Sequence, residues 1–146
     1  MITQHAYSPA TEATKRGIVE IEDQHRSSLY VLLSSLLSGP PTKDLLDKVY
    51  TLSGGENKIG EAIKTLTILS KKLDIKTIER EYNNLFIGVG RGELLPYASF
   101  YMTGFLNEKP LANLRDDMNK IGISRSPSTS DPEDHIASLC EMMSGI

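Results

Sequence analysis

Residues 18–41 read "IVEIEDQHRSSLYVLLSSLLSGPP". Apolar side chains recur here at the spacing that places them on one side of an α-helix, and the stripe consists of Ile18, Ile21, Leu29, Leu32, Leu33, Leu36 and Leu37. The segment ends in Gly39-Pro40-Pro41, where glycine can close a helix and the prolines cannot continue it. The stretch therefore predicts a long amphipathic helix that buries one side against other helices.

The same helical spacing of apolar residues continues through the rest of the chain. We expect further helices over residues 45–52, 59–73, 75–86, 111–121 and 136–143. The boundary near Asp74 stays open, because the third and fourth stripes could form one bent helix. No segment alternates apolar and polar residues between hairpin turns, so strands are not indicated. The sequence predicts an all-α, single-domain helical bundle with roughly antiparallel neighbours.

Local signals place the helix starts and the irregular segments. Thr42 has the side chain and position of an N-cap. Residues 1–14 are expected to form an N-terminal tail, and the Ser- and Pro-containing residues 124–130 a flexible linker. Asp131-Pro132-Glu133-Asp134 then resembles a helix start, with Asp131 as the N-cap and proline in the first turn. The domain is expected to extend over residues 1–146.

Composition excludes several classes of protein. The 146 residues fit one domain with its own core, and 16 basic against 19 acidic residues leave a net charge of -3, which does not favour nucleic acid as a partner. No apolar run is long enough to span a bilayer, and the first twenty residues lack the pattern of an export signal. Cys140 is the single cysteine, which suits a reducing compartment. We expect a cytoplasmic protein without membrane insertion.

The glycine-rich segment Gly88-Val89-Gly90-Arg91-Gly92 raises the question of nucleotide binding. A phosphate-binding loop needs a preceding strand and a lysine followed by serine or threonine, whereas this loop follows a predicted helix and contains neither. The glycines are better explained as a sharp turn between the fourth helix and the aromatic residues that follow.

Metal and nucleophile sites are weakly indicated. Glu22 and His25 have the spacing of half a di-iron site, but the chain has no second Glu-x-x-His. His135 and Cys140 are five residues apart on a helix and point in diverging directions, which disfavours both a zinc site and a Cys–His pair. Two alternatives remain open: a metal-binding helical bundle, or a generic helical interaction domain in which Asp134 only caps a helix.

Three short motifs occur in order: "EYNNLFIGVG" at 81–90, "LPYASFY" at 95–101 and "DPEDHIASLCEMM" at 131–143. Together they resemble the TorD/DmsD/NarJ family of cytoplasmic chaperones for molybdenum-containing oxidoreductases. In that family an aromatic-x-x-Leu-Phe helix end, a glycine and proline loop, an aromatic-x-Ser-x-aromatic segment and a Pro-x-Asp-His motif follow one another. The matching positions are Tyr82, Leu85, Phe86, Gly88, Pro96, Tyr97, Ser99, Tyr101, Pro132, Asp134 and His135.

The resemblance implies a non-enzymatic, all-helical chaperone that needs no cofactor, although some members of the family bind guanine nucleotide weakly. Its partner would be the catalytic subunit of a molybdopterin oxidoreductase of the dimethyl sulfoxide reductase type. The chaperone would bind the apo-enzyme and its twin-arginine signal peptide, and assist cofactor insertion and assembly before export. The residues expected to bind the peptide are Tyr82, Leu85, Phe86, Pro96, Tyr97, Ser99, Tyr101, Pro132, Glu133, Asp134 and His135.

The chain also departs from the family pattern. It has no tryptophan, and Tyr82 stands where several relatives have one. Members usually continue for several helices beyond the Asp-His helix, whereas this sequence stops at Ile146. We therefore expect either a fragment that lacks its C-terminal helices or a chain that exchanges helices with a second copy, so that the protein is a monomer or a helix-exchanged homodimer.

The chemistry of such a peptide sets a geometric condition on the fold. Two guanidinium groups followed by an apolar stretch require an apolar groove with carboxylates beside it. Asp131, Glu133 and Asp134 supply acid near the aromatic segment, and Glu141 lies further along the same predicted helix. The interpretation therefore requires Tyr97 and His135 to lie on the same side of the molecule.

Overall fold

The computed structural model describes residues 9–146 as a set of helices. In chain order these are α1 (Pro9–Leu37), α2 (Lys43–Tyr50), α3 (Lys58–Lys72), α4 (Ile75–Tyr82), the π-helical turn η1 (Asn83–Ile87), α5 (Ala98–Thr103), α6 (Lys109–Lys120) and α7 (Ile136–Gly145). Between residues 9 and 146 the only β-type pairing is one isolated bridge, so the all-α prediction is confirmed.

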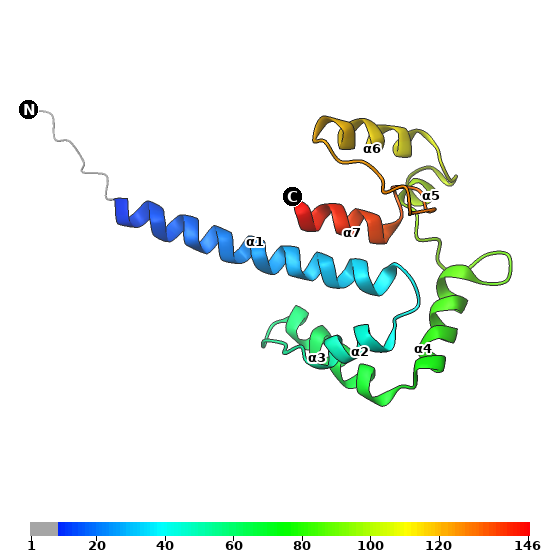
Figure 1. The fold of residues 1–146 in the computed structure, drawn as a ribbon, viewed down its shortest axis with the longest axis horizontal. Coiled ribbons are helices and arrows are strands. Elements are labelled where there is room, and N and C mark those ends of the chain that lie inside the picture. The colour runs from blue at the N-terminus through cyan, green and yellow to red at the C-terminus, as the bar shows by residue number, and fades with distance from the viewer. Residues whose placement is uncertain (1–8) are drawn as a thin grey trace, which may run out of the picture.

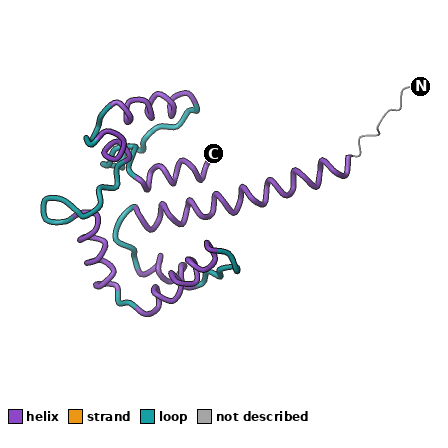
Figure 2. The backbone as a smooth tube through the Cα atoms, turned by 180° about the vertical axis from the view of Figure 1, so that it is seen from behind, coloured by secondary structure: helices purple, strands orange, loops and turns teal. Residues whose placement is uncertain are grey.

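Helix α1 is the axis of the molecule, and α7 lies along one side of it (Figure 1). The α2–α3 hairpin lies on the other side of α1, and α5 and α6 pack on each other beyond α7 (Figures 1 and 2). Two side chains of α1 donate hydrogen bonds to the end of α7: Arg26 Nη1 donates to Met143 O at 2.7 Å, and Ser27 Oγ donates to Ser144 O at 2.7 Å. These bonds satisfy carbonyls that the last turn of a helix leaves without intrahelical donors.

Side-chain caps define the boundaries of the middle helices. Thr42 accepts a hydrogen bond from Leu45 N at the start of α2, as its sequence position predicted. Asp74 accepts one from Thr77 N at 3.0 Å, so α3 and α4 are separate helices and the open boundary lies at this residue. The Thr77 hydroxyl donates to Asp74 Oδ2 at 2.6 Å, and this bond, followed by the one from Thr77 N, holds the pKa of Asp74 below its usual value.

Glycines allow one close approach of the backbone and one turn with positive φ values. A methyl group on Gly60, in the first turn of α3, would lie 2.2 Å from the carbonyl oxygen of Gly55, so position 60 accepts no larger residue without a shift of the backbone. In the loop after η1, Gly88 and Gly90 have φ values of 61° and 87°, which glycine adopts readily. The prediction of a sharp turn there is confirmed.

Two boundaries differ from the prediction. Helix α1 begins at Pro9, so residues 9–14 are helical instead of forming a tail, while residues 1–8 lie outside the described chain. The N-cap of α7 is His135 and not Asp131, because residues 132–135 form a turn, in which His135 N donates to Pro132 O, and His135 itself is extended and pairs with Tyr97. The carboxylate of Asp131 accepts a hydrogen bond from the Tyr97 hydroxyl instead. The short helix α5 was also not expected, since its six residues are too few for a periodic pattern.

Across the described residues, none of the helices combines the length and the apolar character that crossing a membrane requires.

Candidate functional site

The second and third sequence motifs meet at an antiparallel bridge between Tyr97 and His135. Ala98 N donates to Asp134 O at 3.0 Å, and Ile136 N donates to Pro96 O at 2.8 Å. The rings of Tyr97 and His135 meet edge to face, with centroids 5.3 Å apart. The bridge fixes the starts of α5 and α7 against each other, and the geometric condition that Tyr97 and His135 share one side is met.

A buried carboxylate lies behind this bridge. Asp134 is 2% exposed, and its Oδ2 accepts a hydrogen bond from Ser99 N at 2.8 Å, in the first turn of α5. Asp134 therefore caps α5, the helix of the other motif, and does not cap its own helix α7. Its Oδ1 and the hydroxyl of Ser99 have no hydrogen-bond partner within residues 9–146. Asp134 thus joins the two motifs from inside.

The Tyr97 hydroxyl donates to Asp131 Oδ1 at 3.1 Å. Burial, followed by this hydrogen bond, raises the pKa of Tyr97 to about 12, so the phenol stays protonated and remains a donor. Burial also raises the pKa of Tyr82, with a smaller contribution from Asp131. The Tyr82 hydroxyl donates to Leu37 O at 2.8 Å, at the end of α1, and its ring lies 4.8 Å from that of Phe86.

His135 is 7% exposed, and its side chain caps α7. Its Nδ1 accepts a hydrogen bond from Ala137 N at 3.1 Å. Burial lowers the pKa of His135, while the carboxylates of Asp131 and Asp134 oppose this effect. Since a protonated Nδ1 could not accept a hydrogen bond, the cap on α7 requires the neutral imidazole. The ring is therefore a fixed, uncharged wall at neutral pH.

Tyr97 lines a cavity of about 240 Å³, here called the apolar cavity. It opens between the end of α1, the loop after η1, α5 and α7. Its walls are almost entirely carbon, from Leu37, Phe86, Leu94, Leu95, Pro96, Tyr97, Ala98, Tyr101, Ile136 and Leu139. An enclosure of this kind suits apolar side chains of a ligand.

His135 lines a second space, a hollow of about 320 Å³, here called the polar hollow. It is formed by the last turn of α1, residues 128–131 and one side of α7. Its walls carry hydroxyl groups, two carboxylates and the imidazole, from Ser34, Ser38, Ser128, Thr129, Ser130, Asp131, His135, Ala137, Ser138 and Glu141. Tyr97 thus has its ring in the wall of the apolar cavity and donates its hydroxyl proton to a residue of the polar hollow.

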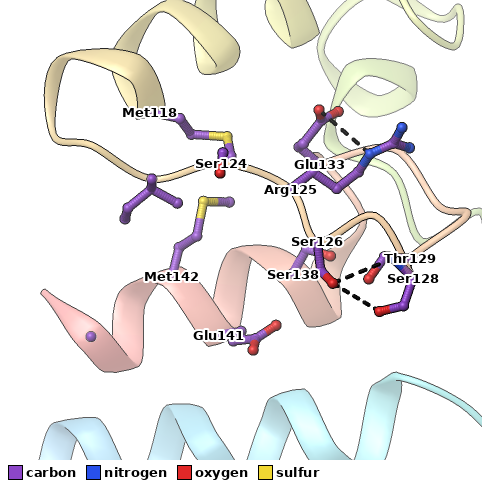
Figure 3. Close-up of a pocket in the computed structure, with 12 residues that line it drawn as sticks. Met118, Ser124, Arg125, Ser126, Ser128, Thr129, Glu133, Ser138, Glu141 and Met142 are labelled. Carbon is purple, nitrogen blue, oxygen red and sulfur yellow. Dashed lines mark hydrogen bonds and ion pairs between the residues drawn. The ribbon is translucent and has the colours of Figure 1, made fainter.

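A third space of about 500 Å³, the linker cavity, separates residues 123–129 from α7. Figure 3 shows Met118, Met142 and Ser124 at one end and the hydroxyl side chains of Ser126, Ser128 and Thr129 at the other. Glu133 also lines this space, and it is 9% exposed. Arg115 donates to its Oε2 from two nitrogens, at 3.0 and 2.8 Å, and these bonds lower the pKa of the carboxyl. Glu133 is consequently occupied by an internal ion pair.

The predicted site residues thus fall into three positions. Phe86, Pro96, Tyr97 and Tyr101 line the apolar cavity, and Tyr82 supports it through Leu37. His135 lines the polar hollow, whereas Ser99 and Asp134 are buried behind the bridge. The other three do not line these two spaces: Leu85 and Pro132 offer backbone carbonyls, to Leu94 N and His135 N, and Glu133 is paired with arginine.

Several lining residues were not predicted. Leu37, Ile136 and Leu139 complete the apolar cavity, and Ser34 and Ser38 complete the polar hollow. The apolar ones belonged to stripes that indicated only a helical core, and the serines were simply polar positions of α1. No signal in the sequence distinguished these cavity-lining residues from ordinary core or surface residues. The packing of α7 against α1 determines which of them face a cavity.

Glu22 and His25 lie on α1 beside Arg26 and Leu29, away from the bridge, around a shallow cavity that Tyr30 and Leu33 also line. Among the described side chains, those of residues 20–146, no group of three or more His, Cys, Asp or Glu is placed to share a metal ion. Cys140 is buried in α7, and burial raises the pKa of its thiol.

Comparison with known proteins is consistent with this geometry. The family model of the nitrate reductase delta subunit matches residues 54–146, which contain all three motifs. The chain belongs to this family, the TorD/NarJ family.

Curated relatives of the TorD/NarJ family member described here are TorD chaperone proteins. The sequence is 28% identical over 130 residues to chaperone protein TorD of Aliivibrio fischeri and 30% identical over 130 residues to that of Vibrio atlanticus. Each alignment covers 79% of this chain and 60% of the relative, so the chain spans well under two thirds of the length of these relatives.

The fold of this family member also matches a crystal structure. It superposes with a TM-score of 0.59 on an Archaeoglobus fulgidus protein assigned to redox enzyme maturation. The match covers 84% of this chain and 70% of the other at 23% identity, which supports a common helical fold.

Proposed function

We propose that this protein is a maturation chaperone that binds the twin-arginine signal peptide and the apo-form of a molybdopterin-dependent oxidoreductase of the dimethyl sulfoxide reductase type. It would hold the client in the cytoplasm while the cofactor is inserted, and it would act by binding and without catalysis. Membership of the TorD/NarJ family and the TorD chaperones among its relatives support this class of function.

One observation carries the proposal: the apolar cavity and the polar hollow both adjoin the Tyr97–His135 pair, since Tyr97 lines the first and His135 lines the second. A twin-arginine signal peptide has the same two parts in sequence, a basic pair followed by an apolar stretch. An extended or helical peptide that crosses this pair could place apolar side chains against Leu139 and Tyr101 while its basic end meets carboxylates. The chemistry of the two spaces therefore matches the basic and the apolar part of the peptide.

Isothermal titration calorimetry with a synthetic twin-arginine signal peptide tests the proposal. Tyr101 lines the apolar cavity and is 64% exposed, so Tyr101→Ala removes part of the wall with little risk to the fold. We expect this variant to bind the peptide about tenfold more weakly, the loss of one aromatic contact of about 1.4 kcal/mol.

Phe105→Ala is the matched control, because Phe105 is an aromatic residue of the adjoining loop, is 67% exposed and lines neither space. It should bind as the wild type does. Absence of peptide binding by the wild-type protein would refute the proposed function, and equal losses in the two variants would refute the placement of the peptide in the apolar cavity.

A further inference from the structure

The carboxylates around the bridge differ in what they have left to offer a ligand. Asp134 is buried behind the bridge and caps α5, and Glu133 is held in an ion pair by Arg115. Asp131 uses Oδ1 for the Tyr97 hydroxyl. Glu141 is exposed on α7, and within the described residues its carboxylate has neither an ion pair nor a hydrogen bond. Glu141 and the second oxygen of Asp131 are therefore the acceptors left for a ligand.

These two carboxylates face the same space. Both line the polar hollow, where serine and threonine hydroxyls supply further acceptors and, among the described side chains of residues 20–146, no lysine or arginine contributes to the wall. The nearest arginine of the linker, Arg125, donates to the carbonyls of Ser130 and Asp131, at 3.5 and 3.3 Å, and so is already bonded. With a neutral His135, the ionised side chains of the hollow carry only negative charge.

The shape of the hollow also restricts its ligand. Glu141, Ser138, Ser128 and Thr129 line both the polar hollow and the linker cavity, so the two spaces adjoin at these residues. In Figure 3 Glu141 extends from α7 below the hydroxyls of the linker. A planar group with several donors can reach carboxylate and hydroxyl acceptors together, and guanidinium has five N–H donors in a fixed plane, whereas ammonium has three on a point charge.

We propose that Glu141 and Asp131 form an arginine-reading site in the polar hollow, and that this site, rather than Glu133 or Asp134, recognises the basic pair of the client's signal peptide. The proposal rests on the proposed function and adds to it the residues that confer specificity. Asp131 would also couple the two spaces, since it holds the Tyr97 hydroxyl with one oxygen and receives a guanidinium with the other. Arginine should then be preferred over lysine.

The first test uses calorimetry with three forms of one signal peptide, in which the basic pair is Arg-Arg, Lys-Lys or Gln-Gln. The wild type should bind the Arg-Arg form roughly fivefold more tightly than the Gln-Gln form, as expected for a partly exposed charge pair, and the Lys-Lys form should lie between them. Glu141→Gln should lose this preference and keep its affinity for the Gln-Gln form. Glu79→Gln, which removes an exposed carboxylate of α4 outside these cavities, should behave as the wild type.

The second test separates this inference from the proposed function. Titration of the protein with arginylarginine amide, followed by two-dimensional NMR, should give saturable shifts confined to residues 128–131 and 137–141, and Glu141→Gln should abolish them. Shifts elsewhere, no shifts, or an unchanged Arg-Arg preference in Glu141→Gln would overturn the inference. Dipeptide binding in the hollow without any signal peptide binding would support the arginine site and refute the proposed function.

Discussion

The α2–α3 hairpin and the Tyr97–His135 bridge both depend on close contact between backbone segments, but they join very different stretches of chain. Gly55 and Gly60, which are five positions apart in the sequence, come into contact at the start of α3. The bridge joins residues that are 38 positions apart, 97 and 135, and a buried carboxylate supports it from behind. The hairpin is thus held by the absence of side chains, whereas the site is held by polar side chains that find one another only in the folded protein.

Gly60→Ala should have the largest effect on the fold and should leave the site intact. The new methyl group would overlap the backbone of Gly55, and we expect a loss of about 3 kcal/mol in the free energy of unfolding. Urea unfolding followed by circular dichroism measures it, with Gly55→Ala as the control because open space surrounds that position. Folded Gly60→Ala should bind the signal peptide normally; a stability gain of about 1 kcal/mol, as helix propensity alone predicts, would contradict the close approach.

Asp134→Ala should have a smaller effect on stability but should also weaken peptide binding. It removes the acceptor for Ser99 N and leaves that buried donor without a partner, a loss of about 2 kcal/mol. Asp134→Asn keeps an acceptor oxygen and should recover much of the stability and the affinity. If thermal denaturation shows the loss but calorimetry shows normal peptide binding for Asp134→Ala, then Asp134 is only a helix cap and the bridge is not needed for the site.

The smallest effect expected is a pH dependence that belongs to the bridge alone. Burial lowers the pKa of His135 below its usual 6.5, so the unfolded chain takes up the proton first and stability falls as the pH decreases below about 6.5. Glu133, whose pKa lies below 4.5 because of Arg115, loses its contribution only in a more acidic range. Melting temperatures between pH 7.5 and 5.5 should therefore fall in the wild type.

His135→Asn tests the origin of this pH dependence, because asparagine can cap α7 but does not titrate. Its melting temperature should change less over the same pH range. His25→Asn, at an exposed position of α1, removes a histidine outside the bridge and should retain the wild-type slope. An unchanged slope in His135→Asn would assign the pH dependence to another group.

Much of the fold could be predicted because its signals are local. The stripe ending at Leu37, the cap at Thr42 and the glycine turn at Gly88 each depend on a few neighbouring residues, and the structure confirms all three. The predicted start of α7 was wrong because it also relied on a local signal. Asp131-Pro132 resembles a local helix start, but the Asp131 carboxylate accepts a hydrogen bond from a distant partner, Tyr97, and a turn at residues 132–135 puts the start of α7 after His135.

For the site, the sequence supplied the chemistry of the residues but could not assign their positions. The motifs placed Tyr97 and His135 in one site, and the structure shows their rings in contact. They did not show that Asp134 faces inward, that Glu133 is paired, or that Leu37 and Ser34, on one helix, face different spaces. Those differences depend on how α7 packs against α1. The role of the predicted peptide-binding residues, and the choice between monomer and helix-exchanged dimer, stay predictions.

The pairing of α1 with α7 also constrains how the protein is made. Arg26 and Ser27 bond to carbonyls that are 117 residues later in the chain, so α1 leaves the ribosome long before its main partner exists. Its apolar stripe must stay exposed during synthesis of the intervening helices, when the α2–α3 hairpin can already form locally. A nascent chain halted before α7 should consequently be an aggregation-prone intermediate, and this chaperone-like protein should itself depend on protection while it is being translated.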